Sequence, residues 1–534
     1  MISHFEILPS KDYNFSSKSL LQYFMIGLFT LGTWSCGEGN RGTEASLADR
    51  DRQKLHELAN SDLDLTGIQL SQAYCGTCHL KPDPELLDKK TWEKSVLPDM
   101  RKRLGLRLPE DPQVAINAMN PEVYPVTAYI SESDWKKIEA YYLEEAPEKP
   151  LPQQEIPEIE KGIPGFKLEI PDLGKQRAPL TTMLRKDMDR NLLYVGDRLG
   201  QVFVLQSDSM EIIDSIQVDS APSDIRFRKD GSLDLLTMGI MDPSTKAIGQ
   251  WNRYPGTGLQ APNLQFENLN RPVHFAFGDL NQNGMEDVVI SNFGNHKGNL
   301  AWFEQTQEGY KEHRLRDFPG ARRAFIEDMD GDGLPDIVVL MAQAYEGVYI
   351  FYNQGGGKFL EKAALQFHPL FGCSDFDLVD FDGDGHLDIL LTNGDNADLS
   401  PIFKNYHGVR IFLNDGKNNF EEAWFFPMHG ASRAIAGDFN GNGEMDVAAI
   451  SFFPDWDQMP RQDFLYFQNQ GNLNFKPFAL PEPLISNWLI LEKADLDNNG
   501  KEDLLLGSLM FQPAQSEGNF FAPWVPFVVL RNHN

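Results

Sequence analysis

Cysteine, positive charge and long apolar runs are all scarce in this chain of 534 residues. Only four cysteines are present, at positions 36, 75, 78 and 373, so a zinc site built from two cysteine pairs is not available. Lysine and arginine number 48 against 78 aspartates and glutamates, and this net charge of −30 argues against nucleic-acid binding, which needs a basic face. The chain also lacks the GxSxG, HExxH and phosphate-loop motifs. Its length is too great for one ordinary domain.

An apolar stretch near the N-terminus has the pattern of an export signal. Lys11 and Lys18 precede the apolar run 20–31, which is shorter than the roughly 20 residues of a membrane-spanning helix. Cys36 follows this run and resembles the cleavage site of a bacterial lipoprotein. Residues 1–36 are therefore predicted to be a signal peptide. Either a lipid on Cys36 or an uncleaved anchor is expected to hold the protein to a membrane of the bacterial cell envelope, in the periplasm or on the surface.

Residues 75–79 read Cys-Gly-Thr-Cys-His, which is the attachment signature of a c-type haem. On one helical turn, Cys75 and Cys78 are spaced to form thioethers with the two haem vinyl groups, and His79 to bind the iron as its proximal ligand. The alternative is a redox-active or zinc-binding cysteine pair that happens to precede a histidine. The signature predicts one covalently bound haem c and electron transfer.

Helical patterns around this motif predict a small all-α domain over residues 63–147, preceded by a polar tether at 37–62. Residues 91–103 are expected to form a second helix. Ser131 is expected to cap a third helix, whose apolar stripe begins with Trp135. This arrangement resembles a monohaem cytochrome c.

A methionine opposite His79 is the expected sixth ligand of the iron, because a thioether there raises the reduction potential. Two candidates lie between the motif and the last helix, Met100 and Met119. Met100 is preferred because the segment from Trp92 to Met100 resembles the corresponding segment of cytochrome-propeller fusions. Pro98 is also expected to break the helix and turn the thioether inward. Histidine, water or an open position are the alternatives.

A proline- and glutamate-rich linker at 148–164 separates the helical domain from a repetitive region at 165–534. One loop pattern, D-x-[DN]-x-[DN]-G-x-x-D, occurs five times there at spacings of 49 to 58 residues, which indicates a repeat architecture. Each copy precedes a short apolar run typical of a buried strand. The copies begin at Asp279, Asp328, Asp380, Asp438 and Asp495.

Asn-x-Gly turns, the first at Asn353, repeat in phase with the loops, so each period holds the four strands of a propeller blade. Two degenerate copies upstream, near Asp187 and Asp230, bring the blades to seven. The last blade lacks a fourth strand, and residues 166–170 have the composition to supply it. The predicted fold is a small all-α cytochrome c-like domain followed by an all-β seven-bladed propeller.

These repeats resemble the FG-GAP/VCBS family, which forms the propeller at the head of integrin alpha chains. The resemblance implies roughly three to five calcium ions in the loops, and the residues agree, because positions 1, 3, 5 and 9 carry hard oxygen donors and position 6 is glycine. The alternative for each loop is a solvated acidic turn. Loops with the most carboxylates are expected to bind most tightly. The candidate ligands are Asp279, Asn281, Asn283, Asp287, Asp328, Asp330, Asp332, Asp336, Asp380, Asp382, Asp384, Asp388, Asp438, Asn440, Asn442, Asp446, Asp495, Asp497, Asn499 and Asp503.

The predicted function is electron transfer, with the propeller as a docking or ligand-binding platform. A redox protein or a quinol is the expected partner of the haem, and a protein or glycan ligand is considered for the propeller. Two other functions stay open: a propeller-based dehydrogenase that passes electrons to its own haem, and a surface adhesion or receptor protein. Fold analogy names no substrate, and no catalytic residue is assigned.

Overall fold

The computed structural model describes residues 54–107 (without 56, 61 and 62), 124–173, 179–256, 260–395, 400–481 (without 401), 484, 486–510 and 525–534. The predicted signal peptide with Cys36, most of the tether, and Met119 lie outside the described residues. The chain divides into two units, Met1–Lys54 and Leu55–Asn534, and the second holds all the elements below. No helix within the described ranges is long and apolar enough to cross a membrane.

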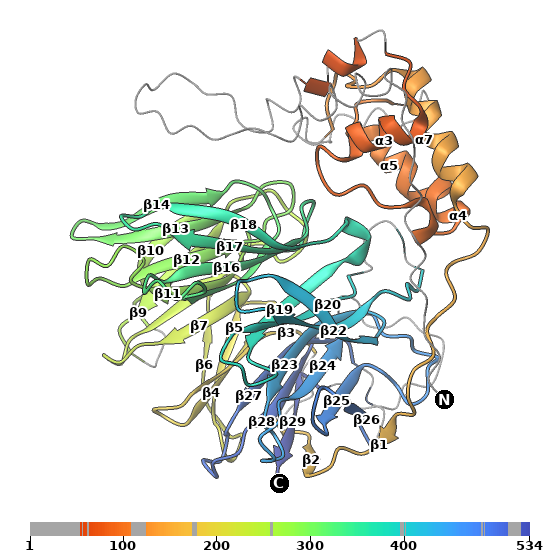
Figure 1. Ribbon diagram of the computed structural model, residues 1–534. Coiled ribbons are helices and arrows are strands. Elements are labelled where there is room, and N and C mark those ends of the chain that lie inside the picture. Colours follow the sequence, from red (N-terminus) through yellow and green to blue (C-terminus); the bar gives the residue numbers. More distant parts are fainter. Residues whose placement is uncertain are drawn as a thin grey trace. The chain divides into compact units, whose positions relative to one another are not determined.

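Helix α3 (Gly67–Cys75) places the cysteine motif at its C-terminal end (Figure 1). Its first turn is fixed by a capping box, in which the Thr66 hydroxyl accepts a bond from the Gln69 amide and the Gln69 side chain accepts one from the Thr66 amide. The last helix, α7 (Glu132–Glu145), begins where the Ser131 hydroxyl accepts a bond from the Asp134 amide, as the sequence predicted. A short 3-10 turn, η1 (Pro84–Leu86), lies between them.

The predicted second helix is present but is not broken at Pro98. Three helical segments follow one another without a gap: α4 (Lys89–Thr91), the π-helical turn η2 (Trp92–Val96) and α5 (Leu97–Arg103). Pro98 lies in the first turn of α5, directly after the π turn, where its missing N–H interrupts no regular ladder. The prediction that this proline ends the helix is therefore wrong.

Aromatic side chains hold the helices together. Tyr74, Trp92, Trp135 and Tyr142 are each at most 2% exposed and belong to one core. The rings of Trp92 and Tyr142 lie 4.4 Å apart between centroids, in a tilted arrangement. The predicted aromatic stripe of the last helix is thus buried.

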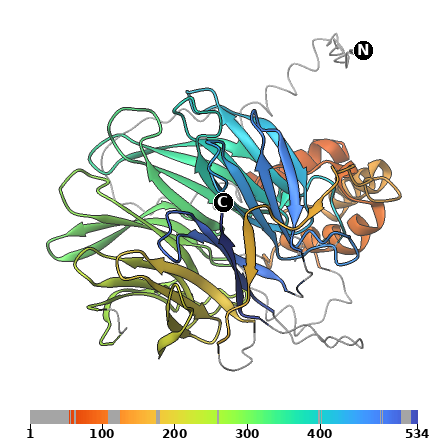
Figure 2. The ribbon, with the colours of Figure 1, turned by 90° about the horizontal axis from the view of Figure 1, so that it is seen from below.

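Seven sheets form the remainder, each with four antiparallel strands, and they confirm the predicted seven-bladed propeller. Figure 2 shows these sheets arranged around a central axis. Blades one and two contain β3 (Thr181–Asp187), β4 (Leu192–Asp197), β5 (Gln201–Gln206), β6 (Ile212–Gln217), β7 (Pro222–Phe227), β8 (Leu233–Thr237), β9 (Gly249–Tyr254) and β10 (Asn263–Leu269). Blades three and four contain β11 (Pro272–Gly278), β12 (Asp287–Asn292), β13 (Asn299–Thr306), β14 (Gly309–Arg316), β15 (Ala321–Glu327), β16 (Asp336–Met341), β17 (Gly347–Asn353) and β18 (Phe359–Gln366).

Blades five to seven follow a 3-10 turn, η3 (Pro369–Phe371). Their strands are β19 (Cys373–Val379), β20 (Asp388–Asn393), β21 (Gly408–Asn414), β22 (Phe420–Pro427), β23 (Ala431–Gly437), β24 (Asp446–Ser451), β25 (Phe464–Asn469), β26 (Phe475–Ala479), β27 (Trp488–Ala494), β28 (Asp503–Ser508) and β29 (Phe527–Asn532). The first strand of every blade contacts the first strand of the next, and β27 contacts β3, so the seven first strands close into an inner ring. The second strand of each blade is the apolar run after the loop, and it is fully buried in blades three to seven.

An N-terminal strand closes the propeller. Strand β2 (Phe166–Glu169) pairs antiparallel with β29, with Leu168 opposite Leu530, and supplies the fourth strand of blade seven as predicted. The linker also contributes a strand that the sequence did not predict: β1 (Glu160–Lys161) pairs in parallel with β26. Both additions cover strand edges that would otherwise be open.

Candidate functional site

The cysteine motif ends helix α3 in a compact turn. The amides of Cys78 and His79 both donate to the Cys75 carbonyl, at 3.3 and 3.2 Å, and the Thr77 hydroxyl donates to the Tyr74 carbonyl at 2.7 Å. The His79 ring lies with its Nδ1 2.8 Å from the Leu80 carbonyl. When that nitrogen carries the proton, the Nε2 lone pair is left for a metal.

The environment of Cys75 disfavours a thiolate. Cys75 and Cys78 are both free, without a disulfide between them. Burial raises the pKa of Cys75 to about 12, so the thiolate that a redox-active or zinc-binding pair requires is disfavoured. Burial also lowers the pKa of His79 and keeps its imidazole neutral, the form that binds iron. Two thiols and a neutral, oriented imidazole fit a covalently attached haem.

Helix α5 lies beside this motif. The charge of Arg103 acts on both Cys78 and His79, and Arg103 is itself paired with Asp99 at 2.7 Å. Met100 is one turn before Arg103 on the same side of the helix, and it packs against the aromatic core. Met100 thus belongs to the helix whose Arg103 acts on the motif, whereas Met119 lies outside the described residues.

In all five acidic loops the amide of position 6 donates to the side chain of position 1 and the amide of position 7 donates to the side chain of position 5, as the loop at Asp328 illustrates. The Asp328 carboxylate accepts bonds from the amides of Asp332 and Gly333, at 3.2 and 2.9 Å. Asp332 in turn accepts a bond from the Leu334 amide at 2.8 Å. Gly333 adopts φ +85°, a left-handed conformation that side chains disfavour, and this explains glycine at position 6. The carboxylates of positions 1, 3 and 5 are thereby held facing one another.

Two of the loops bring three carboxylates together. The ligand atoms of each group all lie within 4.8 Å of one another, a spacing that one cation can bridge. The groups are Asp328, Asp330 and Asp332 in blade four, and Asp380, Asp382 and Asp384 in blade five. In the other three loops asparagine replaces aspartate at one or two of these positions.

The aspartate at position 9 has a second task that the sequence did not reveal. Asp336 is 1% exposed and accepts bonds from the amides of Met329 and Asn353, at 2.9 and 2.7 Å. It therefore joins the loop to the Asn-x-Gly hairpin of the same blade. Burial, with repulsion from Asp330 and Asp332, raises the pKa of Asp336 to about 6. Asp287, Asp388, Asp446 and Asp503 each likewise bond an amide of the third or fourth strand.

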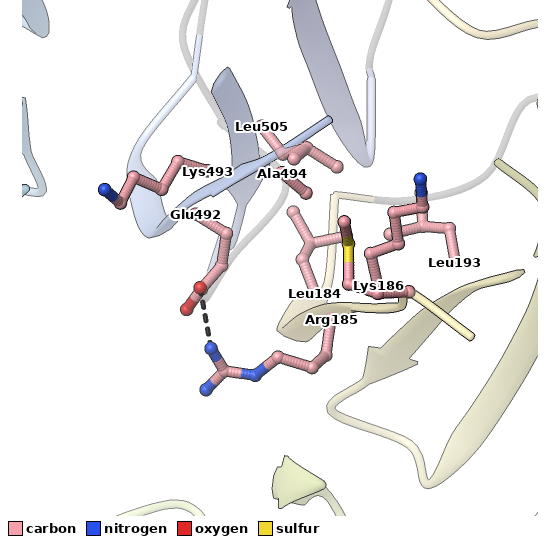
Figure 3. A pocket seen from close by; sticks show the side chains of 9 residues that line it. Leu184, Arg185, Lys186, Leu193, Glu492, Lys493, Ala494 and Leu505 are labelled. Atoms are coloured by element: carbon pink, nitrogen blue, oxygen red, sulfur yellow. Dashed lines mark hydrogen bonds and ion pairs between the residues drawn. The ribbon is translucent and has the colours of Figure 1, made fainter. Parts of the chain in front are cut away.

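A ring of charged side chains lines the inner strands, and sequence reasoning missed it. Arg185 on β3 contacts Asp224 on β7 at 3.0 Å and Glu492 on β27 at 2.7 Å, and Figure 3 shows the second of these pairs. The ring continues through Arg433, which lies 2.9 Å from Glu492 and 3.3 Å from Asp375. Ionisable residues inside each of the seven inner strands were the available signal.

The last member of this incomplete ring is the histidine His274. Arg323 on β15 lies 3.3 Å from Asp375, and His274 on β11 lies 3.8 Å from Asp224. Six of the seven junctions between neighbouring inner strands are thus joined by these contacts. Burial lowers the pKa of His274 to about 4, so this member of the ring is neutral near pH 7. The ring ties the blades together.

Comparisons with known proteins find a match to one repeat family and weak similarity to solved structures. No curated protein matches the chain. Among solved structures, that of BBS1N in complex with ARL6DN is similar, with 8% identity, a TM-score of 0.44, and coverage of 69% of this chain and 97% of that chain. The WD40 domain of Neurospora crassa Pan2 is similar with 12% identity, a TM-score of 0.40, and coverage of 66% and 88%. Residues 328–391 match the family described as FG-GAP-like repeat, so the propeller carries FG-GAP-like repeat sequence in blades four and five.

Proposed function

We propose that this protein is an exported c-type cytochrome that transfers electrons through one haem, with its propeller as a calcium-stiffened docking platform. The observation that carries the proposal is the set of donors at the end of helix α3. Cys75 and Cys78 are free thiols one turn apart, and His79 has its Nδ1 engaged by a carbonyl. When bound, the haem supplies a one-electron couple at its iron.

The chain's own residues would position that group and expose it to a partner. Cys75 ends a helix that packs on the aromatic core, whereas Cys78 is exposed. One attachment point is therefore anchored in the domain, and the other lies at the surface where a redox protein or a quinol can approach. Met100 is the proposed sixth ligand. Attachment of c-type haem outside the cytoplasm agrees with the export signal, and we propose that a lipid on Cys36 holds the protein to the envelope.

Covalent haem attachment tests this function directly. The protein should be made in a bacterium that attaches c-type haem and run on a denaturing gel stained for haem. The wild type should retain haem, and a Cys75→Ala, Cys78→Ala double variant should retain none. Cys373→Ala is the matched control, because Cys373 is a buried thiol of β19 in the propeller. A wild-type protein that carries no covalent haem would contradict the proposal.

Substrate dependence separates an electron carrier from a dehydrogenase. Candidate sugars, alcohols and quinols are mixed with the oxidised protein while the haem absorption bands are followed. Reduction by a quinol or a redox protein alone supports the proposed carrier. Reduction by a sugar or an alcohol would instead assign catalysis to the propeller.

Calcium in the propeller loops is a second part of the proposal, and it rests on the two carboxylate groups of blades four and five. A metal that binds only the folded state stabilises it, so a chelator should lower the melting temperature of the propeller. Asp330→Asn should reduce this difference, whereas Glu308→Gln, an exposed change on a hairpin of blade three, should leave it unchanged. Absence of bound metal in elemental analysis would refute this part.

A further inference from the structure

The loop of blade seven, at residues 495–503, has protein cations within reach of its carboxylates. The Lys186 ammonium donates to the Asp495 carbonyl and, at 3.1 Å, to Asn498 Oδ1. Its charge acts on Asp495, Asp497 and Asp503, the three acidic residues of the pattern in this loop. Lys186 comes from β3 of blade one and is 7% exposed, so it is held in place by the junction between the first and last blades.

An arginine reaches the same loop from the other side. Arg531 on β29 is 6% exposed, and its Nη1 lies 3.1 Å from Asp503 Oδ2. Three loop carboxylates are therefore accompanied by two cationic side chains, although Arg531 also pairs with Glu169. The site carries most of its counter-charge within the protein.

The two degenerate blades also have a cationic side chain beside an acidic residue of the loop region. In blade one, Arg190 Nη1 lies 2.6 Å from Asp187 Oδ2. In blade two, the fully buried Asp234 is paired with Arg228 at 3.1 Å and with Arg253 at 2.8 Å. In each of these blades a guanidinium therefore pairs with the aspartate next to the turn between the first and second strands, Asp187 in blade one and Asp234 in blade two.

Blades four and five show no such cation among the residues that the structure describes. Within the ranges that the structure describes, no lysine or arginine forms an ion pair with the four pattern aspartates of either loop. Their carboxylates instead converge on one another. Like charges at this distance repel unless a cation lies among them, and here the protein does not provide one.

We propose that Lys186 and Arg531 exclude calcium from the loop of blade seven, so that metal binds in blades four and five and protein cations replace it in blades seven, one and two. This inference rests on the proposed calcium sites. A divalent ion entering the loop of blade seven meets two positive charges and a net site charge near −1, compared with up to −4 in blades four and five. Calcium affinity falls as the negative charge of the ligand set falls.

Calorimetric titration of the intact, metal-free protein with calcium tests this assignment. Asp330→Asn should remove one calcium equivalent, whereas Asp495→Asn should remove none. Lys186→Met should add one equivalent, which disappears again when Asp495→Asn is combined with it. Lys493→Met is the matched control. Lys493 is a lysine of blade seven that pairs with Glu502, a residue outside the ligand positions of the loop.

The outcomes separate this inference from the proposal beneath it. Loss of an equivalent in Asp495→Asn, while Asp330→Asn also loses one, would overturn the exclusion and leave the calcium sites intact. Absence of calcium binding in every variant would overturn both. If Lys186→Met does not fold, the comparison of Asp330→Asn with Asp495→Asn still decides the matter, because Asp330 is exposed and Asp495 is partly exposed, and neither is a core residue.

Discussion

Acid should weaken the propeller through His274, the neutral member of the inner charged ring. Its imidazole faces Asp224 and Asp375 and also Arg185 and Arg323, and burial holds its pKa near 4 against an ordinary value of 6.5. Between these two pH values the unfolded chain binds a proton at this position and the folded chain does not. Stability therefore falls as the pH drops from 6.5 towards 4.

The size of this effect follows from the pKa difference. Each pKa unit corresponds to about 1.4 kcal/mol, so acidification from pH 6.5 to 4.5 should remove roughly 2.5 kcal/mol through this residue alone. The side chain is 19% exposed, which leaves this value little reduced by solvent. His274→Gln keeps a neutral hydrogen-bonding side chain beside Asp224 and cannot titrate.

The assay compares urea unfolding at pH 7 and pH 4.5, followed by the fluorescence of the buried tryptophans Trp251 and Trp488. The wild type should lose roughly 2.5 kcal/mol more than His274→Gln over this interval. His313→Gln is the control, because His313 lies on the outer strand β14 and stacks on Trp302 at 4.6 Å. Equal pH sensitivity of the wild type and His274→Gln would refute the reasoning.

Three further predictions concern the ligand, the anchor and the closure. Met100→Ala should abolish the sulfur–iron charge-transfer band and lower the reduction potential, while Met119→Ala should do neither; the reverse result in the visible spectrum and in potentiometry would assign the ligand to Met119. Cys36→Ser should disturb processing and release the protein from the membrane fraction, and a mature N-terminus found elsewhere would rule out lipidation at that cysteine. Lys167→Pro should destabilise the propeller by roughly 1–2 kcal/mol in denaturant unfolding. Lys167 lies opposite Arg531, two positions from Gly165, whose carbonyl accepts from the His533 amide, so the Lys167 N–H is a ladder donor that proline removes; unchanged stability would mean that β2 does not close the ring.

The helices, the strands and the acidic loops could be predicted from the sequence because they depend on interactions between residues that are close in the chain. The spacing of the five-residue motif suits two thioethers and an imidazole. Ser131 caps helix α7 through a hydrogen bond to Asp134, only three residues away in the sequence. Each blade could likewise be predicted from a short stretch of sequence, because its acidic loop, the glycine of that loop and the hairpin turn lie within about fifty residues. Even the closing strand was readable, since blade seven was one strand short.

Contacts between the first and last blades were decided only by the tertiary structure, because they join residues about 300 positions apart. Lys186 and Asn498 meet across the junction of the first and last blades, and nothing near either residue signals the other. The pairing of Arg185 with Glu492 arises for the same reason. The prediction that Pro98 breaks its helix was wrong because a π turn precedes the proline, and no residue pattern predicts that turn. The sequence by itself determined which loops carry acidic side chains, whereas the closure of the propeller determined which of those carboxylates have a cationic side chain beside them.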